Sequence, residues 1–304
     1  MKIIEKYIGG DKQTDQMAIA LGYFDGIHLG HQKLIKTAKK IAEEKNIKSA
    51  VFTFKSHPLS ILSPERAPKL IYSNNKKIKI IQSLGIDYLI FLDFTRDLMQ
   101  TRAEDFVKDI LVDKFNIKHA IIGYNYTFGY KESGNPQTLK RLGQKYGFEV
   151  TIIETVKANE ITISSTNIRK QIQKGEMEKA REFLGCYYSI SGKVVRGKGL
   201  GKKLSIPTAN ININNNIVLP KNGVYKTIVQ VRDKKYKALT NIGLNPTFEN
   251  HPYSIENYIL DFNEDIYGRD IEIYFLKRIR PEKRFDTLDQ LVAQVQKDIE
   301  IVRE

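Results

Sequence analysis

The chain has 304 residues and a formal net charge of +14, with 41% hydrophobic and 28% charged residues. This composition excludes a disordered chain and leaves room for two domains, each with its own core. A single cysteine excludes an internal disulfide. No leader is evident and no apolar run approaches the roughly 20 residues of a membrane span, so we expect a cytoplasmic protein without a membrane segment.

The basic residues are spread over the whole sequence, without a basic tail or an arginine-rich block. Positive charge permits an RNA-binding protein, but it also follows from surface lysine that aids solubility and from anionic nucleotide substrates. Because the sequence has no clustered basic stretch and no tryptophan, we expect small-molecule substrates and no nucleic acid. RNA binding remains an alternative from another functional class.

In the first part of the chain, short apolar runs alternate with amphipathic segments. One helical face is marked by Leu34, Ile35 and Ala38, and a second helical segment contains Phe106 and Val107. Strands that are apolar on both faces and joined by helices predict a parallel sheet with right-handed crossovers. The strands that we expect are 18–21, 50–54, 88–92, 120–122 and 150–153.

The stretch 22–31, GYFDGIHLGH, follows the first of these strands and precedes a helical pattern. Its glycines let backbone N–H groups approach a phosphate, and the helix N-terminus adds partial positive charge. His28 and His31 can donate hydrogen bonds to an α-phosphate as negative charge builds on it. Two histidines at this spacing also permit a zinc site, although no third ligand is evident, or a purely structural turn.

Two further stretches of the first part carry chemistry. Residues 163–169, ISSTNIR, place three hydroxyls before a helical pattern and an arginine just inside it. Alone, this pattern is typical of an ordinary helix N-cap. Residues 123–129, GYNYTFG, follow a strand and carry three aromatic rings, which alone are compatible with a turn that buries aromatics in the core.

After about residue 184, glycine and asparagine separate runs that alternate with a period of two. This spacing predicts a small antiparallel barrel or sandwich. The expected strands are 193–196, 224–231, 236–242, 255–262 and 271–276. A terminal helix follows, with Thr287 and Gln290 as a capping-box pair. Its apolar stripe, which we expect to pack on the barrel, consists of Leu288, Leu291, Val292, Val295 and Ile299.

The stretch 192–210 is rich in glycine and lysine and ends in the tetrapeptide PTAN. It is compatible with a mobile surface hairpin or with a flap that covers a triphosphate. Farther along, Glu256 shares one strand face with Tyr258, Leu260 and Phe262. A carboxylate on this more apolar face indicates either a structural hydrogen bond or a functional role, since burying an unpaired charge is costly.

The stretch 22–31 resembles the HxGH signature of the nucleotidylyltransferase superfamily, and its longer form GxFDGxHxGH resembles bacterial FAD synthetases. The stretch 164–169 matches the superfamily motif SSTxIR, whose hydroxyls and basic residue hold the β- and γ-phosphates. The resemblance implies a Rossmann-like nucleotidylyltransferase sheet with His28 and His31 as catalytic residues. The nucleotide-binding residues that it implies are Gly22, Phe24, Asp25, Gly26, His28, Gly30, His31, Ser164, Ser165, Thr166 and Arg169.

Two loops of the first part resemble flavin-contacting loops of the same family. Residues 123–129 resemble GxNFxFG, with Tyr126 where phenylalanine is common, and residues 54–58 resemble FxPHP, with Ser56 in place of a proline. This resemblance implies flavin contacts by Asn125, Tyr126, Phe128 and His57.

The second part resembles riboflavin kinases. By that resemblance Thr208 and Asn210 of the PTAN motif bind the Mg²⁺ of ATP through oxygen ligands. Glu256 would deprotonate the ribityl 5′-hydroxyl, because a neutral alcohol needs a base. Further implied contacts are Gly197, Gly199 and Gly201 to the nucleotide, and Arg280 and Phe285 to the flavin. Departures from the residues common in the family are Lys203, Ser205 and Asn245.

Together the resemblances imply the bacterial bifunctional riboflavin kinase/FMN adenylyltransferase (FAD synthetase) family. Residues 1–184 would adenylylate FMN to FAD, and residues 185–304 would phosphorylate riboflavin to FMN with ATP. A monofunctional adenylyltransferase with a regulatory barrel is the alternative that the departures leave open. We expect Mg²⁺ as cofactor, riboflavin, FMN and ATP as substrates, and a monomer or weak self-association.

Overall fold

A computed structural model describes residues 1–6, 12–197, 207–214, 216–244 and 253–304. The chain divides into two compact units. The first, called here the sheet unit, comprises Met1–Lys69 and Ser73–Ser164. The second, called the barrel unit, comprises Leu70–Tyr72 and Ser165–Glu304. Within the described residues, no helix combines the length and the apolar character that crossing a membrane requires.

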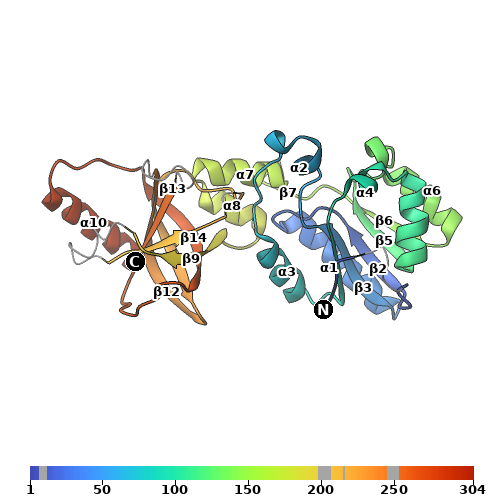
Figure 1. The fold of residues 1–304 in the computed structure, drawn as a ribbon, viewed down its shortest axis with the longest axis horizontal. Coiled ribbons are helices and arrows are strands. Elements are labelled where there is room, and N and C mark those ends of the chain that lie inside the picture. The colour runs from blue at the N-terminus through green and yellow to red at the C-terminus, as the bar shows by residue number, and fades with distance from the viewer. Residues whose placement is uncertain (7–11, 198–206, 215, 245–252) are drawn as a thin grey trace. The chain divides into compact units, whose positions relative to one another are not determined.

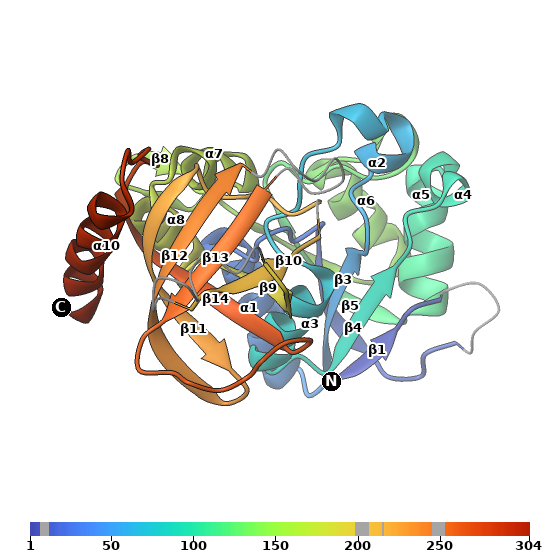
Figure 2. The ribbon, with the colours of Figure 1, turned by 60° about the vertical axis from the view of Figure 1, so that its left-hand side comes forward.

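The sheet unit is built on six parallel strands in the order β1-β4-β3-β2-β5-β6, which are labelled between Figures 1 and 2. All five predicted strands are confirmed, and β1 adds a sixth at the edge. The strands are β1 (Lys2–Ile4), β2 (Met17–Leu21), β3 (Lys48–Phe54), β4 (Tyr88–Leu92), β5 (Ile117–Gly123) and β6 (Glu149–Ile153), with a separate hairpin of β7 (Lys157–Ala158) and β8 (Ile161–Thr162).

Helices cover both faces of this sheet, as its doubly apolar strands require. One core joins the sheet to α1 and α3, and the other joins it to α4, η2 and α6 (Figure 1). The helices are α1 (Leu29–Glu44), α2 (Leu59–Leu62), η1 (Pro64–Arg66), α3 (Asn74–Ser83), α4 (Arg96–Gln100), α5 (Ala103–Asp105), η2 (Phe106–Lys114), η3 (Tyr130–Glu132) and α6 (Pro136–Tyr146).

The helical segment that begins at Phe106 differs from the expected α-helix. Residues Phe106–Lys114 form a π-helix, and the N–H of Phe115 donates to the carbonyl of Ile110, five residues earlier. Phe106, Val107 and Ile110 are nevertheless buried. The apolar pattern therefore identified the buried face correctly, but it did not distinguish the two helical windings.

The barrel unit contains a closed antiparallel barrel in the order β10-β13-β12-β11-β14-β9 (Figure 2). Because β9 also pairs with β10, the sheet closes on itself, which decides for a barrel over a sandwich. Its elements are α7 (Ser165–Lys174), α8 (Met177–Leu184), β9 (Ser189–Val195), β10 (Ala209–Asn212), β11 (Gly223–Val231), β12 (Lys234–Leu244), β13 (Tyr253–Ile259), β14 (Asp270–Arg280) and α10 (Leu288–Arg303).

The terminal helix α10 begins as predicted, since the side chain of Thr287 accepts a hydrogen bond from the N–H of Gln290. Ile299 and Val302 pack with barrel residues in one apolar cluster, and Val295 contacts it. The first residue of the predicted stripe does not pack there, because Leu288 is 65% exposed. The expected packing is therefore correct only for the later turns of the helix.

Candidate nucleotide sites in the two units

In the sheet unit, the strand order places two of the predicted loops next to each other. The chain runs from β2 outward through β3 and β4 and then returns to β5 on the other side of β2. Strands β2 and β5 pair in parallel, with Ala20 opposite Ile121. The turn 22–31 and the loop 123–129 therefore follow neighbouring strands at the carboxyl edge, where open α/β sheets bind ligands.

The turn 22–31 has an unusual backbone. Phe24, Gly26 and Ile27 have φ angles of 52°, 81° and 39°, in the left-handed region that favours glycine. Phe24 and Ile27 hold this conformation while 1% exposed. At Gly30, an added Cβ would lie 3.1 Å from the ring of His28. The surrounding core thus holds a strained turn, and such strain clusters at functional sites.

The two histidines form a stacked pair at the start of α1. Their ring centroids are 3.6 Å apart with an interplanar angle of 18°. Nδ1 of His28 accepts the backbone N–H of His31 at 3.3 Å, so His28 is the N-cap and its Nε2 carries the proton of the neutral ring. Burial lowers the pKa of His28 to about 4, and it lowers that of His31 well below the usual range. Both rings are therefore neutral donors at pH 7.

Beneath this turn lies a buried lysine that the sequence analysis did not single out. Lys77 of α3 is 2% exposed, and its Nζ donates to the carbonyls of Tyr23 at 3.0 Å and Phe54 at 3.1 Å. The buried Asp25 is close enough for its charge to favour the ammonium form. A lysine four residues before Ile81, on the apolar face of α3, was the available signal.

The predicted flavin contacts fall in the loops after β3 and β5. The ring of His57 packs edge-to-face on Tyr23, with centroids 4.8 Å apart, and its Nδ1 accepts the N–H of Leu59. Asn125 is exposed. Tyr126 stacks on Phe128 with centroids 5.6 Å apart, and burial raises the pKa of its phenol. These loops thus present an exposed amide beside fixed aromatic rings.

The SSTxIR stretch is divided between the two units. Ser164 is the last residue of the sheet unit, whereas α7 of the barrel unit begins at Ser165 and contains Thr166 and Arg169. The predicted helix is present, but it begins at Ser165, so only Ser164 precedes it, and Ser165 and Thr166 lie in its first turn. The phosphate contacts of these residues stay a prediction.

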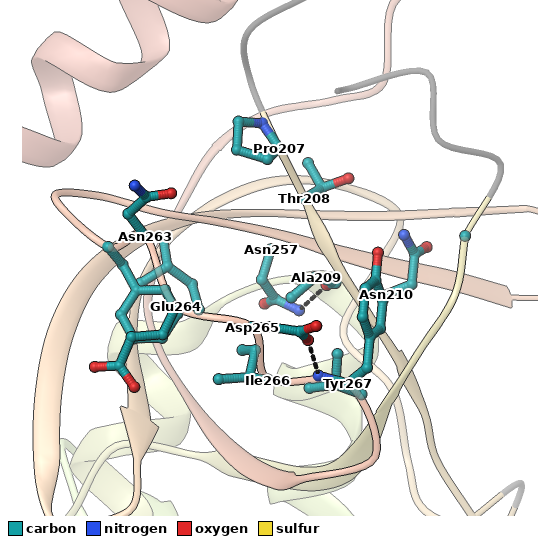
Figure 3. Close-up of a pocket in the computed structure, with 14 residues that line it drawn as sticks. Pro207, Thr208, Ala209, Asn210, Asn257, Asn263, Glu264, Asp265, Ile266 and Tyr267 are labelled. Carbon is teal, nitrogen blue, oxygen red and sulfur yellow. Dashed lines mark hydrogen bonds between the residues drawn. The ribbon is translucent and has the colours of Figure 1, made fainter. Parts of the chain in front are cut away.

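In the barrel unit, a cavity of about 310 Å³ opens beside the PTAN tetrapeptide, residues 207–210, at the start of β10 (Figure 3). It is lined by Gly197, Thr208 and Asn210 among the predicted residues, and also by Glu264 and Asp265. Hydroxyl, amide and carboxylate oxygens are the ligands that Mg²⁺ prefers, so this lining fits a hydrated magnesium ion. Other predicted positions lie outside the described residues: Gly199, Gly201, Lys203, Ser205 and Asn245.

A buried hydrogen-bond chain reaches this cavity and was missed in the sequence analysis. Asn257 is fully buried, and its Nδ2 donates to the carbonyl of Ala209 at 3.0 Å (Figure 3). Its Oδ1 accepts a hydrogen bond from the hydroxyl of Thr240 at 2.8 Å. The Thr240 hydroxyl in turn lies 2.7 Å from the hydroxyl of Thr227. Polar residues at interior positions of alternating strands were the available signal. The chain ties the backbone between Thr208 and Asn210 to the barrel interior.

Glu256 lies on β13 directly opposite Asn210 of β10 and Asn241 of β12. Its Oε1 is 3.0 Å from the hydroxyl of Ser254. The interior face of this strand carries Ile255 and the other buried residues, whereas Glu256 is half-buried on the outer face. Of the residues predicted to share its face, Tyr258 and Leu260 pack in the apolar cluster with α10. Leu260 and Phe262 lie beyond the end of β13 at Ile259.

Arg280 and Phe285 sit at the C-terminal end of β14 and beyond. The guanidinium of Arg280 binds the buried carboxylate of Asp298 in α10, with Nη2 2.7 Å from Oδ2 and Nε 3.1 Å from Oδ1. It also lies 6.0 Å from the centre of the Phe285 ring. Arg280 therefore has a structural ion pair in this unit, and its flavin contact stays a prediction.

Comparison with known proteins matches both parts of the chain. A family model described as FAD synthetase matches residues 10–167, and one described as riboflavin kinase matches residues 184–304. Curated proteins named bifunctional riboflavin kinase/FMN adenylyltransferase include one from Buchnera aphidicola subsp. Schizaphis graminum, 40% identical over 100% of this chain and 98% of the relative. Another, from Bacillus subtilis, is 39% identical over 94% of this chain and 92% of the relative.

A solved structure is also similar over the whole chain. The crystal structure of a macrolide-efflux protein from Streptococcus pneumoniae shares 32% of the sequence, with a TM-score of 0.92. The similarity covers 100% of this chain and 99% of that chain.

Proposed function

The chain belongs to the family of bifunctional riboflavin kinase/FMN adenylyltransferases, and we propose that its two units divide the two reactions between them. Membership gives the chain both activities: it phosphorylates riboflavin to FMN with ATP, and it adenylylates FMN to FAD. The monofunctional alternative is not favoured, because family models match both parts. The stacked, neutral histidines at a strained turn are the observation that supports adenylyl transfer in the sheet unit.

In adenylyl transfer, a phosphate oxygen of FMN attacks the α-phosphorus of ATP, and pyrophosphate leaves. The nucleophile is already anionic, so the site needs no general base. It must align the reactants and stabilise the negative charge that builds on the α-phosphate. The neutral rings of His28 and His31 supply N–H donors for that charge, and the N-terminus of α1 supplies backbone amides.

In the barrel unit, the nucleophile is a neutral alcohol, the ribityl 5′-hydroxyl, and a base must take its proton. Glu256 is the proposed base, since it is half-buried and adjoins Asn210 across the strand pair. Thr208 and Asn210 would hold Mg²⁺. Magnesium supplies charge neutralisation on the phosphates of ATP.

The sequence boundary at residue 185 stays a proposal for the start of the kinase domain. In the structure, α7 and α8 also belong to the barrel unit, and a Cβ added at Gly175 between them would lie 2.6 Å from the side chain of Arg278 in β14. We therefore expect fragment 185–304 to fold and phosphorylate riboflavin, and fragment 165–304 to melt at a higher temperature. Circular dichroism melting and FMN production measure both. An unfolded 185–304 beside a folded 165–304 would move the boundary to α7.

The division of labour is tested by giving the purified chain riboflavin and MgATP and separating FMN and FAD by chromatography. We expect FMN first and then FAD, with both lost when magnesium is chelated. Supplying FMN bypasses the first reaction. Variants in one unit should then stop one product only, and a variant of the turn 22–31 that lowered both equally would contradict the assignment.

A further inference from the structure

Lys77 carries a charge into the core of the sheet unit, and its contacts there are specific. Its ammonium donates to one carbonyl in the turn after β2, that of Tyr23, and to one at the end of β3, that of Phe54. The ammonium also lies 4.4 Å from the centre of the Tyr23 ring, which in turn packs on His57. One side chain therefore connects the histidine-bearing turn to the loop that contains His57.

The carbonyl of Tyr23 has a second donor. The hydroxyl of Thr53, which is fully buried in β3, donates to the same oxygen at 2.6 Å. The residue that follows Tyr23, Phe24, is the first of the left-handed residues in the turn. The two hydrogen bonds thus fix the chain at the point where the strain begins. Strained backbone persists only where its surroundings hold it in place.

Packing alone does not account for a lysine at this position. An apolar side chain of the same length would fill the space without the cost of removing an ammonium from water. What the ammonium adds is charge-assisted hydrogen bonding, about twice as strong as bonding between neutral groups. The benefit falls on the two carbonyls that the ammonium joins.

We propose that Lys77 is a positioning residue for adenylyl transfer. Its ammonium holds the Tyr23 and Phe54 carbonyls in place, and the His28 and His31 rings thereby keep the orientation needed to donate hydrogen bonds to the α-phosphate. The inference rests on the proposed assignment of adenylyl transfer to the turn 22–31. Lys77 itself touches backbone and ring atoms of the protein, so its effect on the reaction passes through the turn.

Several charged or titratable groups face this ammonium. They are Asp25 in the turn, His31 on α1 and the ring of Tyr23. Burial lowers the pKa of Lys77 to about 8, although the charge of Asp25 opposes the shift. The charge, and with it the stronger hydrogen bonding, is therefore lost as the pH rises through about 8.

The test compares Lys77→Met with Lys79→Met, the same change at an exposed position of the same helix. We expect Lys77→Met to lower kcat for FAD formation from FMN roughly 100-fold, since a small misplacement of reacting groups has this effect. Riboflavin phosphorylation by the same molecules should stay normal, and Lys79→Met should change neither rate. The ratio of wild-type to Lys77→Met rates should be constant below about pH 8 and fall above it.

A folded Lys77→Met chain with normal kcat for FAD formation overturns the proposal, even if its melting temperature is lower. If Lys77→Met does not fold, Thr53→Val removes the other hydrogen bond to the Tyr23 carbonyl with little change of volume. It should then lower the same kcat, and wild-type FAD formation should decline above about pH 8. Absence of both effects also overturns it. Normal FAD formation by His28→Ala would instead reject the site assignment itself.

Discussion

The two units hold the backbone beside their candidate nucleotide sites in different ways. In the sheet unit a buried ammonium, Lys77, donates to the Tyr23 carbonyl. In the barrel unit a buried neutral amide, Asn257, donates to the Ala209 carbonyl. Both donors are inaccessible to solvent, so each makes its bond in a low-dielectric interior where hydrogen bonds are strong.

The difference follows from the backbone that each donor supports. Ala209 lies in β10, which is paired on both sides by β9 and β13, so the ladder already fixes most of its geometry. Tyr23 precedes left-handed residues that no ladder supports. A neutral amide is sufficient for the first, whereas the second is held by a charge. The charge brings a dependence on pH that the barrel unit lacks at this position.

The largest expected effect separates the reactions by their need for a base. Glu256→Gln should slow riboflavin phosphorylation by roughly 10²–10⁴, because an amide cannot accept the hydroxyl proton. The KM for ATP should hardly change, and FAD formation from supplied FMN should continue. Steady-state rates with each substrate measure this. Near-normal FMN formation would remove Glu256 from the mechanism.

A second, smaller effect, a loss of FAD formation, tests the sheet unit. His28→Ala or His31→Ala should lower FAD formation by roughly 10²–10³, the usual loss when one donor to a developing charge is removed. Riboflavin phosphorylation by the same chain serves as the internal control and should persist. An equal loss of both activities would mean that the variants unfold the chain or that the two sites are not separate.

The acid stability of the sheet unit offers a third test. The folded-state pKa of His28 is lowered from 6.5 to about 4, so between these values the unfolded chain binds the proton first. Stability is therefore lost as the pH falls through this window, by on the order of 3 kcal/mol in total. Urea unfolding of wild type and His28→Asn from pH 7 to pH 4 should show a steeper decline for wild type. Parallel curves would contradict the burial of this ring.

The smallest expected effect concerns the uncharged hydrogen-bonded residues Thr227, Thr240 and Asn257 in the barrel. Asn257→Val leaves the Ala209 carbonyl and the Thr240 hydroxyl without this partner, which costs about 1–3 kcal/mol of stability. We expect kcat/KM for riboflavin phosphorylation to fall about tenfold, or 1.4 kcal/mol, with the same factor at pH 7 and pH 9. Thr227→Val changes a residue farther from Ala209 along the series of hydrogen bonds, so it should lower this rate less. A factor that varied with pH would remove the contrast with Lys77.

Much of this architecture was predictable from the sequence because it depends on local periodicity. Apolar runs of strand length predicted five of the six strands of the parallel sheet, and the Thr287 cap predicted where α10 begins. The same reasoning failed where neighbours decide. Leu288 belongs to the helical stripe but is 65% exposed, whereas Ile299 and Val302 in the later turns of α10 pack on the barrel. The strand pattern also ran on to Phe262, whereas β13 ends at Ile259, and closure of the barrel puts the Glu256 side of this strand outside.

By itself the sequence predicted which residue types would meet the phosphates, because glycine, histidine and hydroxyl patterns are contiguous along the chain. For Lys77 it offered only the spacing from Ile81, a weak signal, since a lysine in a helical pattern is ordinarily at the surface. Only the tertiary structure brings its ammonium to the carbonyls of Tyr23 and Phe54, which are far from Lys77 in the sequence. Likewise, only the tertiary structure aligns Thr227, Thr240 and Asn257 across three strands. The reason is physical. The need for a buried polar group depends on unpaired partners that distant segments supply, and a local pattern carries no record of them.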